Sequence, residues 1–224
     1  MKISVIIPAF NEEKYLPYCL KALKNQILKP YEIIVIDNNS TDNTYQIAKK
    51  FNVKVIREKR KGTTFARNTG FNKAQSKIIA RIDADTRPPE DWLLNILNHF
   101  KKNPKTEAIT GPIIFYDLPF KTAFFSKIYL KASKLISGFY YLLGPNMVIT
   151  KQAWNKVKDD VCLDDKKVHE DIDLSIHLAD KGINIQYDEK IVNFASARRI
   201  KYKPWSFFIE YPIRWAKTLK AHKS

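Results

Sequence analysis

The chain of 224 residues has few cysteines, few glycines and no long apolar run. Its two cysteines, Cys19 and Cys162, form no paired motif, so we expect free thiols in a reducing, cytoplasmic compartment. None of the six glycines occurs as Gly-x-Gly, which excludes a dinucleotide-binding fingerprint. No stretch approaches the roughly 18 uninterrupted apolar residues that a membrane span requires. These absences exclude three classes: disulfide scaffolds, dinucleotide enzymes and integral membrane proteins.

Acidic residues are also scarce, since 39 lysines and arginines against 23 acids give a net charge of +16. Such an excess predicts an anionic partner: nucleic acid, lipid headgroups or a phosphorylated substrate. From residue 196 onward, bases and aromatics accompany a single acid, Glu210. They are Arg198, Arg199, Lys201, Lys203, Arg214, Lys217, Lys220 and Lys223, with Tyr202, Trp205, Phe207, Phe208, Tyr211 and Trp215. This mixture is typical of a membrane–water interface or of a surface that stacks single-stranded nucleic acid.

A second basic and apolar segment spans residues 119–144. It contains no acid, and Lys121, Lys127, Lys131 and Lys134 interrupt its aromatic and aliphatic residues. The pattern indicates an amphipathic helix lying on a membrane, or a helix that packs in the core with its lysines outward. Taken with the C-terminal residues, it favours peripheral contact with an anionic membrane surface over nucleic-acid binding.

Short apolar runs alternate with helical patterns along the chain. Strands are expected at 3–7, 33–36, 53–56, 78–82, 108–111 and 146–149. Helices are expected from Asn11, from Ser40 or Thr41 to Lys50, over 64–74 and 90–101, from Thr150, and over 170–181 ending on Gly182. Strands this apolar are buried on both faces, which predicts a mostly parallel sheet in an α/β sandwich. We expect one unit over 1–195, with halves 1–112 and 113–195, and an extension over 196–224.

Polar residues follow three of the predicted strands. Pro8–Asn11, Asp37–Ser40 and Asp83–Asp85 all lie at carboxyl ends, where ligands of parallel sheets bind. Asp83 and Asp85, on alternate positions, would offer hard oxygen ligands to Mg²⁺ or Mn²⁺ bridging to phosphates. The competing interpretation is a turn with two solvated acids. The neighbouring polar strand tips favour the metal.

A second acidic pair, Glu170-Asp171, opens the predicted helix over 170–181. A carboxylate there, across the cleft from the metal, could act as a catalytic base. The alternative is that both acids merely complement the helix dipole. A metal site with a separate base points to an enzyme.

Four motifs in order resemble those of family 2 glycosyltransferases. They are Ser4-Val5-Ile6-Ile7-Pro8-Ala9-Phe10-Asn11-Glu12, Val35-Ile36-Asp37-Asn38-Asn39-Ser40-Thr41-Asp42, Gly62 with Ala66-Arg67-Asn68-x-Gly70, and Asp83-Ala84-Asp85. Glu170-Asp171 extends the resemblance to about residue 182. One departure is Asn38-Asn39, where many members have Asp-Gly. The resemblance implies the GT-A fold, a Rossmann-like α/β/α sandwich with a mostly parallel central sheet.

The resemblance also implies a role for each matching residue. The nucleotide sugar would be bound by Pro8, Ala9, Asn11, Glu12, Asp37, Asn39, Gly62, Arg67, Asp83 and Ala84. Asp85 and Asp83 would hold the metal, and Asp171, beside Glu170, would be the catalytic base.

The implied activity is a metal-dependent, inverting transfer of a sugar from a donor such as a UDP-sugar. The acceptor would be a glycan or a lipid-linked sugar at the inner membrane face, as in the synthesis of cell-surface glycans. One variant is transfer to a polyprenyl phosphate, an acceptor that is already anionic and needs no base. Two rivals are a nucleotidyltransferase of similar fold, which would release pyrophosphate, and a non-enzymatic nucleic-acid-binding module.

Overall fold

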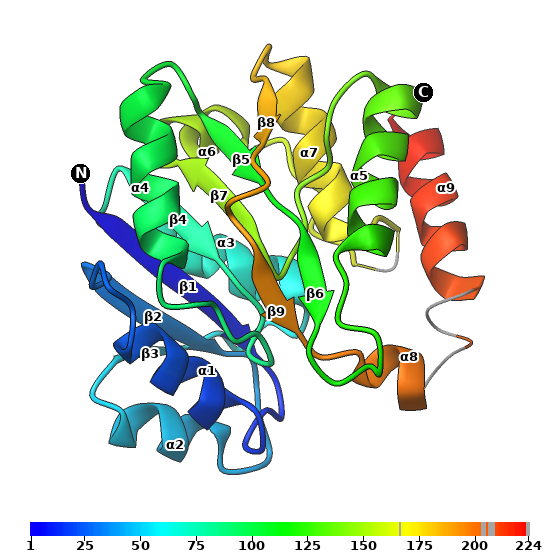
Figure 1. Ribbon diagram of the computed structural model, residues 1–224. Helices are drawn as coiled ribbons and strands as arrows, with labels where there is room; N and C mark the ends of the chain where they lie inside the picture. Colours follow the sequence, from blue (N-terminus) through cyan, green and yellow to red (C-terminus); the bar gives the residue numbers. More distant parts are fainter. Residues whose placement is uncertain (166, 203–204, 206–208, 223–224) are drawn as a thin grey trace.

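A seven-stranded sheet with the order β3-β2-β1-β4-β7-β5-β8 forms the centre of the molecule (Figure 1). The computed structural model describes residues 1–165, 167–202, 205 and 209–222. The strands of this sheet are β1 (Ile3–Ala9), β2 (Glu32–Asp37), β3 (Lys54–Arg57), β4 (Ile78–Arg81), β5 (Ala108–Thr110), β7 (Met147–Thr150) and β8 (Ile185–Tyr187). Strand β7 runs antiparallel to β4 and β5, and the other pairs are parallel. The expectation of a mostly parallel sheet is therefore confirmed.

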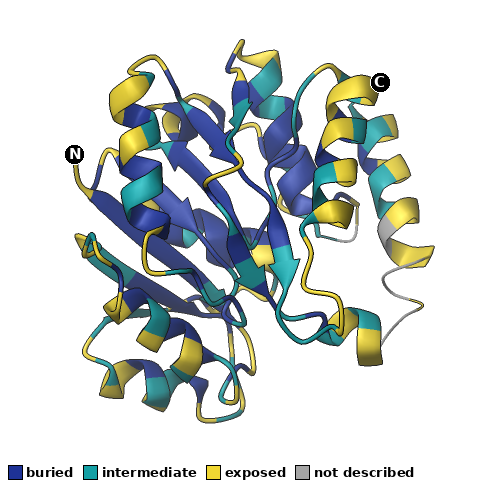
Figure 2. Ribbon diagram, in the orientation of Figure 1, coloured by how far each residue is buried: buried dark blue, intermediate teal, exposed yellow. Residues whose placement is uncertain are grey.

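Helices cover both faces of the sheet, which makes an α/β/α sandwich (Figure 1). One layer holds α1 (Leu16–Lys24), α2 (Thr44–Lys50) and α4 (Trp92–Lys102); the other holds α3 (Thr63–Lys73), α6 (Lys151–Val157) and α7 (Glu170–Asp180). Alternate strand residues serve the two layers: Val5 and Ile7 join the first core cluster, and Ile6 joins the second. Figure 2 shows the strands buried between the helices.

The rest of the chain lies beside this sandwich. Strands β6 (Ile113–Phe115) and β9 (Asn193–Ala195) form a small parallel sheet. The remaining helices are α5 (Phe124–Ser137), α8 (Arg198–Tyr202) and α9 (Tyr211–Ala221). Trp215 and Leu219 of α9 pack against Ile172 and Ile176 of α7. The described part of the C-terminal extension is thus attached to the main unit.

Some expectations for that extension fall on residues outside the described part of the chain, namely Lys203, Phe207, Phe208 and Lys223. Among the described residues, no helix combines the length and the apolar character needed to cross a bilayer. Cys19 and Cys162 are free thiols, as expected.

Strand β1 does not stop at Pro8, as its sequence indicates, but continues to Ala9. Proline lacks the N–H that a central strand would use. Here β1 pairs with β4 only as far as Ile6, so at Pro8 the strand has a partner only in β2. The proline therefore lies near the carboxyl end of β1, where the pairing with β4 has already ended.

The expected helix start at Asn11 is wrong, because α1 begins at Leu16. Asn11 has φ 55°, and its Oδ1 accepts a hydrogen bond from the Thr41 amide at 2.8 Å. The start expected at Ser40 or Thr41 is wrong as well, since α2 begins at Thr44. Residues 40–41 instead join the tips of β1 and β2, because the Asn11 amide also donates to Ser40 Oγ at 3.0 Å. The side chains that were expected to cap the two helices instead form hydrogen bonds between loops.

Other helix ends follow the sequence closely. Thr150 caps α6 by accepting a hydrogen bond from the Ala153 amide at 3.0 Å. Helix α7 ends before Gly182, which has φ 73° and donates to the carbonyl of Ala179, while Ile183 donates to that of Leu178. This is a Schellman motif, which favours glycine at the left-handed position. The expected start of α6 and the expected end of α7 are therefore confirmed.

Candidate active site

A cleft of about 570 Å³ opens at the carboxyl ends of β1 and β4. Its donor-side wall includes Pro8, Ala9 and Glu12 with the Asp83-Ala84-Asp85 motif. Gly144, Glu170, Asp171 and residues 195–200 line the same cleft. The two acidic motifs of the sequence, 85 residues or more apart, therefore face one cavity.

Arg198, the first residue of α8, reaches across the cleft to the donor-side acids. Its Nε lies 2.9 Å from Oδ2 of Asp85, and its Nη1 donates to Glu12 at 2.8 Å. A second bond from Nη2 makes the contact with Glu12 bidentate. The guanidinium also stacks over Tyr15, with its carbon 4.6 Å from the ring centre. A basic residue from the C-terminal extension thus pairs with two acids that line the cleft.

The acids at this point fit a divalent cation. Burial, and next the charge of Asp83, raise the pKa of Asp85 to about 7, although Arg198 opposes the shift. Burial also raises the pKa of Glu12. Mg²⁺ and Mn²⁺ prefer hard oxygen ligands such as carboxylates. The raised pKa values show that ionising these neighbouring carboxyl groups is costly when no cation is bound. A bound cation would relieve that cost.

Arg81, at the end of β4, connects the two acidic motifs. Its Nη2 lies 2.8 Å from Asp83 Oδ1 and 3.1 Å from Glu170 Oε1, and its Nη1 lies 3.9 Å from Asp171 Oδ1. The side chain is 4% exposed. Our sequence analysis did not single out this residue. The available signal was a lone arginine in the otherwise apolar run from Ile78 to Ile82.

Glu170 lies in a buried ion-pair network. Nη1 of the fully buried Arg67 donates both to its carboxylate and, at 2.7 Å, to its backbone carbonyl. Burial alone would raise the pKa of Glu170, but Arg81 and Arg67 outweigh it and hold the pKa below its ordinary value. Glu170 is therefore an anion whose partners are protein arginines.

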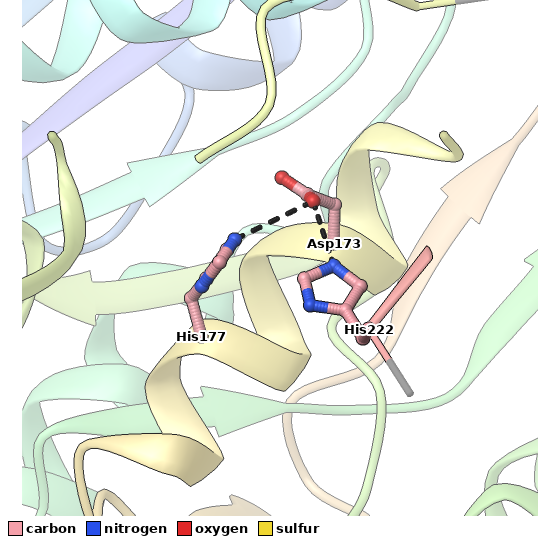
Figure 3. A group of neighbouring side chains, drawn as sticks. All are labelled: Asp173, His177 and His222. Carbon is pink, nitrogen blue, oxygen red and sulfur yellow. Dashed lines mark hydrogen bonds and ion pairs between the residues drawn. The ribbon is translucent and has the colours of Figure 1, made fainter. Parts of the chain in front are cut away.

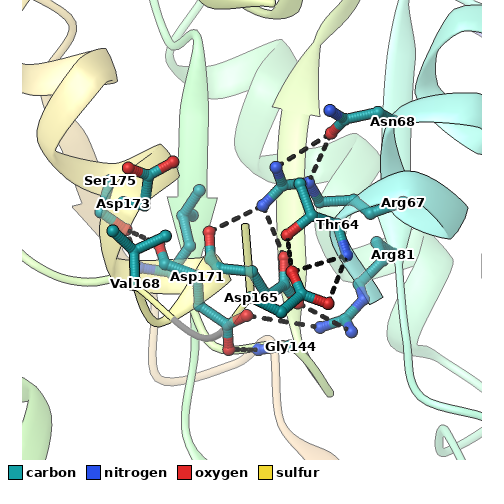
Figure 4. A network of polar contacts seen from close by, with 12 residues as sticks. Thr64, Arg67, Asn68, Arg81, Gly144, Asp165, Val168, Asp171, Asp173 and Ser175 are labelled. Atoms are coloured by element: carbon teal, nitrogen blue, oxygen red, sulfur yellow. Dashed lines mark hydrogen bonds and ion pairs between the residues drawn. The ribbon is translucent and has the colours of Figure 1, made fainter. Parts of the chain in front are cut away.

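Asp171 has the opposite electrostatic environment. Burial, and next the adjacent Glu170 carboxylate, raise the pKa of Asp171 well above its ordinary value. Its Oδ2 accepts a hydrogen bond from the Gly144 amide at 2.8 Å, which orients the carboxyl group (Figure 4). A Cβ at residue 144 would lie 1.9 Å from Arg81 Nη1, so only glycine permits this approach. Two adjacent acids thus have pKa values pushed apart.

The sequence-predicted donor residues do not all meet in the main cleft. Asp37 and Asn39 line a smaller adjoining pocket of about 420 Å³ with Ser40, Arg57 and Lys59. Of the described lining residues, neither pocket includes Asn11, Gly62 or Arg67. Arg67 does not line the cleft but binds Glu170, which does.

The departure at Asn38 has a structural role that the sequence did not reveal. Its Oδ1 accepts from the Gly62 amide at 2.9 Å, and its Nδ2 donates to the carbonyls of Glu58 and Arg60. The side chain therefore holds the 58–62 loop beside the cleft, which it also lines. This loop precedes α3, which carries Arg67.

Helix α5 borders the cleft on the acceptor side and leaves large apolar side chains in solvent. Phe125 and Tyr129 line the cleft. Phe125 is 67% exposed and Leu135 is 87% exposed, while Leu130 is buried. The interpretation as a core-packing helix therefore accounts for only a small part of α5. Its exposed apolar residues are Phe124, Phe125, Ile128, Tyr129, Leu135 and Ile136.

Comparisons with known proteins agree on one family. A model described as glycosyl transferase family 2 matches residues 4–156. A dolichyl N-acetyl-α-D-glucosaminyl phosphate 3-β-D-2,3-diacetamido-2,3-dideoxy-β-D-glucuronosyltransferase of Methanococcus voltae is 26% identical over 210 residues, 85% of this chain and 65% of the relative. A dolichol-phosphate mannosyltransferase of Pyrococcus furiosus is 35% identical over 107 residues, 45% of this chain and 30% of the relative. The chain thus spans less than two thirds of the length of either relative.

Among solved structures, a mannosyltransferase from Pyrobaculum calidifontis, in complex with GDP-Man and Mn²⁺, superposes with a TM-score of 0.78. The match covers 100% of this chain and 64% of that one at 20% identity. It establishes the similarity of the fold.

Proposed function

The chain belongs to glycosyl transferase family 2 and has the GT-A fold, and from this premise we propose an inverting, cation-dependent sugar transfer in the cleft described above. One observation carries the proposal. The Asp83–Asp85 motif and Asp171 line the same cavity, and Arg81 contacts both Asp83 and Asp171. The donor would be a nucleoside diphosphate sugar, with UDP-sugars the first class to test.

On the donor side, Asp83 and Asp85, with Glu12 nearby, would hold Mg²⁺ or Mn²⁺. When bound, such a cation stabilises the charge that develops on the leaving nucleoside diphosphate. Arg198 now neutralises Glu12 and Asp85. With a cation in that role, the guanidinium becomes available to the diphosphate oxygens, for which its bidentate geometry is suited.

On the acceptor side, Asp171 would be the catalytic base. It takes the proton of the acceptor hydroxyl while that oxygen bonds to the anomeric carbon and the bond from this carbon to the diphosphate oxygen breaks. Its raised pKa supports this role, because an effective base has a pKa closer to the working pH than an ordinary aspartate. Glu170 would instead be a positioning residue that keeps Arg67 and Arg81 in place.

The acceptor that we propose is lipid-linked and presented at an anionic membrane surface. The exposed residues of α5 support this, because the helix lines the cleft with Phe125 and Tyr129 and also exposes Lys131 and Lys134. The dolichyl-linked sugar in the name of the Methanococcus voltae relative points the same way. The dolichol phosphate in the name of the Pyrococcus furiosus relative instead matches the variant with a polyprenyl phosphate acceptor. A lipid anchored in the bilayer could then offer its headgroup directly to Asp171.

The test combines donor binding with product analysis. The protein is screened by thermal shift against UDP-, GDP- and dTDP-sugars with and without Mn²⁺, since a ligand of the native state stabilises it. Turnover is followed as release of nucleoside diphosphate, and NMR gives the anomeric configuration of the product. Asp171→Asn is expected to keep donor binding and lose turnover.

Each rival predicts a different result. Full turnover in Asp171→Asn would favour a polyprenyl phosphate acceptor and remove the base assignment. Pyrophosphate release would indicate nucleotidyl transfer. No cation-dependent stabilisation by any donor would refute the donor site. Sedimentation with vesicles containing anionic lipid, by the wild type but not by Lys131→Glu with Lys134→Glu, checks the membrane surface.

A further inference from the structure

A second cluster of potential metal ligands lies outside the cleft, between α7 and α9 (Figure 3). It consists of Asp173 and His177 of α7 and His222, which follows α9. Nε2 of His222 lies 2.9 Å, and Nε2 of His177 3.5 Å, from the same oxygen, Oδ1 of Asp173. All three ligand atoms lie within 4.8 Å of one another.

Asp173 is held as a ligand would be. Its side chain is 1% exposed, and its other oxygen accepts a hydrogen bond from the Cys162 amide at 2.9 Å. This bond orients the carboxylate so that Oδ1 faces the two imidazoles, as supporting contacts do in protein metal sites. The i, i+4 spacing on α7 places His177 one turn from Asp173, on the same face of the helix.

The two histidines leave a route to solvent. Their side chains are 18% and 16% exposed for His177 and His222, whereas Asp173 is buried. An ion could therefore enter from the histidine side and keep a water molecule as a further ligand. The rings meet edge to face, with centroids 4.7 Å apart.

We propose that Asp173, His177 and His222 form a binding site for Zn²⁺ or a similar transition metal, separate from the donor-site cation. Two imidazole nitrogens and one carboxylate oxygen are zinc ligands, whereas Mg²⁺ favours oxygen alone. Zinc bonds of ~2.0–2.1 Å at tetrahedral angles place ligand atoms about 3.3 Å apart. The observed separations of 2.9 and 3.5 Å bracket that value.

The site would fasten the C-terminal helix to the helix that carries Asp171. Helix α9 already holds the segment before α7, because Arg214 donates to the carbonyls of Asp165 and Val168. Thr218 adds a further contact, since its Oγ1 accepts from the His169 amide at 2.7 Å. A metal at His222 would close this arrangement at the end of α9. We therefore expect bound zinc to stabilise the acceptor wall of the cleft.

The experiment is calorimetric titration of the tag-free, chelator-treated protein with Zn²⁺. We expect one ion per wild-type chain, and at least a tenfold loss of affinity in His177→Gln and in His222→Gln. Both side chains are partly exposed, so these variants should fold. Substitution with Co²⁺ gives an independent readout, as visible absorption of a tetrahedral site that both variants lose.

Two controls separate this site from other places where metal could bind. His99→Gln removes a histidine that also pairs with a carboxylate, 2.6 Å from Asp188, but whose other nitrogen contacts Gln186. Asp85→Asn alters the donor site. Both are expected to keep zinc binding and its stabilising effect on the melting temperature. The proposal is overturned if the wild type binds no stoichiometric zinc, or if the double variant of His177 and His222 binds it equally well.

Discussion

Glu170 and Asp171 are neighbours in the chain, and we predict that neutralising each has opposite consequences. In Glu170→Gln, the buried guanidinium groups of Arg67 and Arg81 lose the carboxylate that they share. Arg67 is fully buried and Arg81 is 4% exposed, so water cannot replace it. Breaking a buried ion pair by removing one partner costs about 3–5 kcal/mol. For a chain of this size, that lowers the melting temperature by roughly 6–20 °C.

Asp171→Asn should leave stability unchanged or raise it. Burial and the Glu170 charge raise the pKa of Asp171 in the folded state above its unfolded value. Near neutral pH, the ionised carboxylate therefore opposes folding, and the neutral amide removes that penalty. The amide oxygen can still accept the bond from Gly144. This variant would lose turnover while keeping its fold, which identifies a residue that acts in the chemistry.

The assay measures thermal unfolding at pH 7 by circular dichroism, and turnover as nucleoside diphosphate release. Glu170→Gln has a further signature: without the neighbouring negative charge, the pKa of Asp171 falls and the acid limb of the rate profile moves to lower pH. The reasoning is refuted if both variants are destabilised equally. It is also refuted if Glu170→Gln melts within about 2 °C of the wild type, a loss of no more than roughly 1 kcal/mol.

Three further predictions concern individual residues. Gly144→Ala places a Cβ 1.9 Å from Arg81 Nη1, and the resulting shift of Asp171 should lower kcat on the order of 10²-fold with a smaller effect on donor KM. Burial lowers the pKa of His169 to about 4 from an ordinary 6.5, so the unfolded chain binds this proton first, and stability falls as pH drops from 6.5 to 4. Urea unfolding at pH 7 and 5 should show His169→Asn losing about 2 kcal/mol of this dependence. Gly182→Ala, at φ 73° with open space around it, should cost about 1–2 kcal/mol through backbone strain alone, measured by urea unfolding.

Local signals in the sequence determined the main elements of the fold. Apolar runs with polar tips located the strands, and the side chain of Thr150 and the conformational freedom of Gly182 located the ends of two helices. The order of the motifs was enough to identify the family and to expect Asp83–Asp85 and Asp171 at one cleft, which all three line. These features depend on a few consecutive residues, which is the range over which propensity and capping act.

The tertiary structure decided the partners of the charged residues. Asn11 looked like a helix cap, but it pairs with Thr41 of the neighbouring strand tip. Arg67 was expected to bind the nucleotide sugar and Arg81 was not singled out, yet both neutralise Glu170, from α3 and β4 respectively. Nothing local distinguishes a buried arginine from a solvated one, because burial depends on which elements pack above it.

The same limit applies to the C-terminal residues and to the second metal site. The helical pattern places His177 one turn from Asp173, but His222 joins them from 49 residues away only because α9 packs along α7. The sequence by itself therefore determined the class of fold, the family and the acidic motifs. The tertiary structure decided the electrostatic environment of each carboxylate, since that environment is set by charges that chain folding brings within a few ångströms of it.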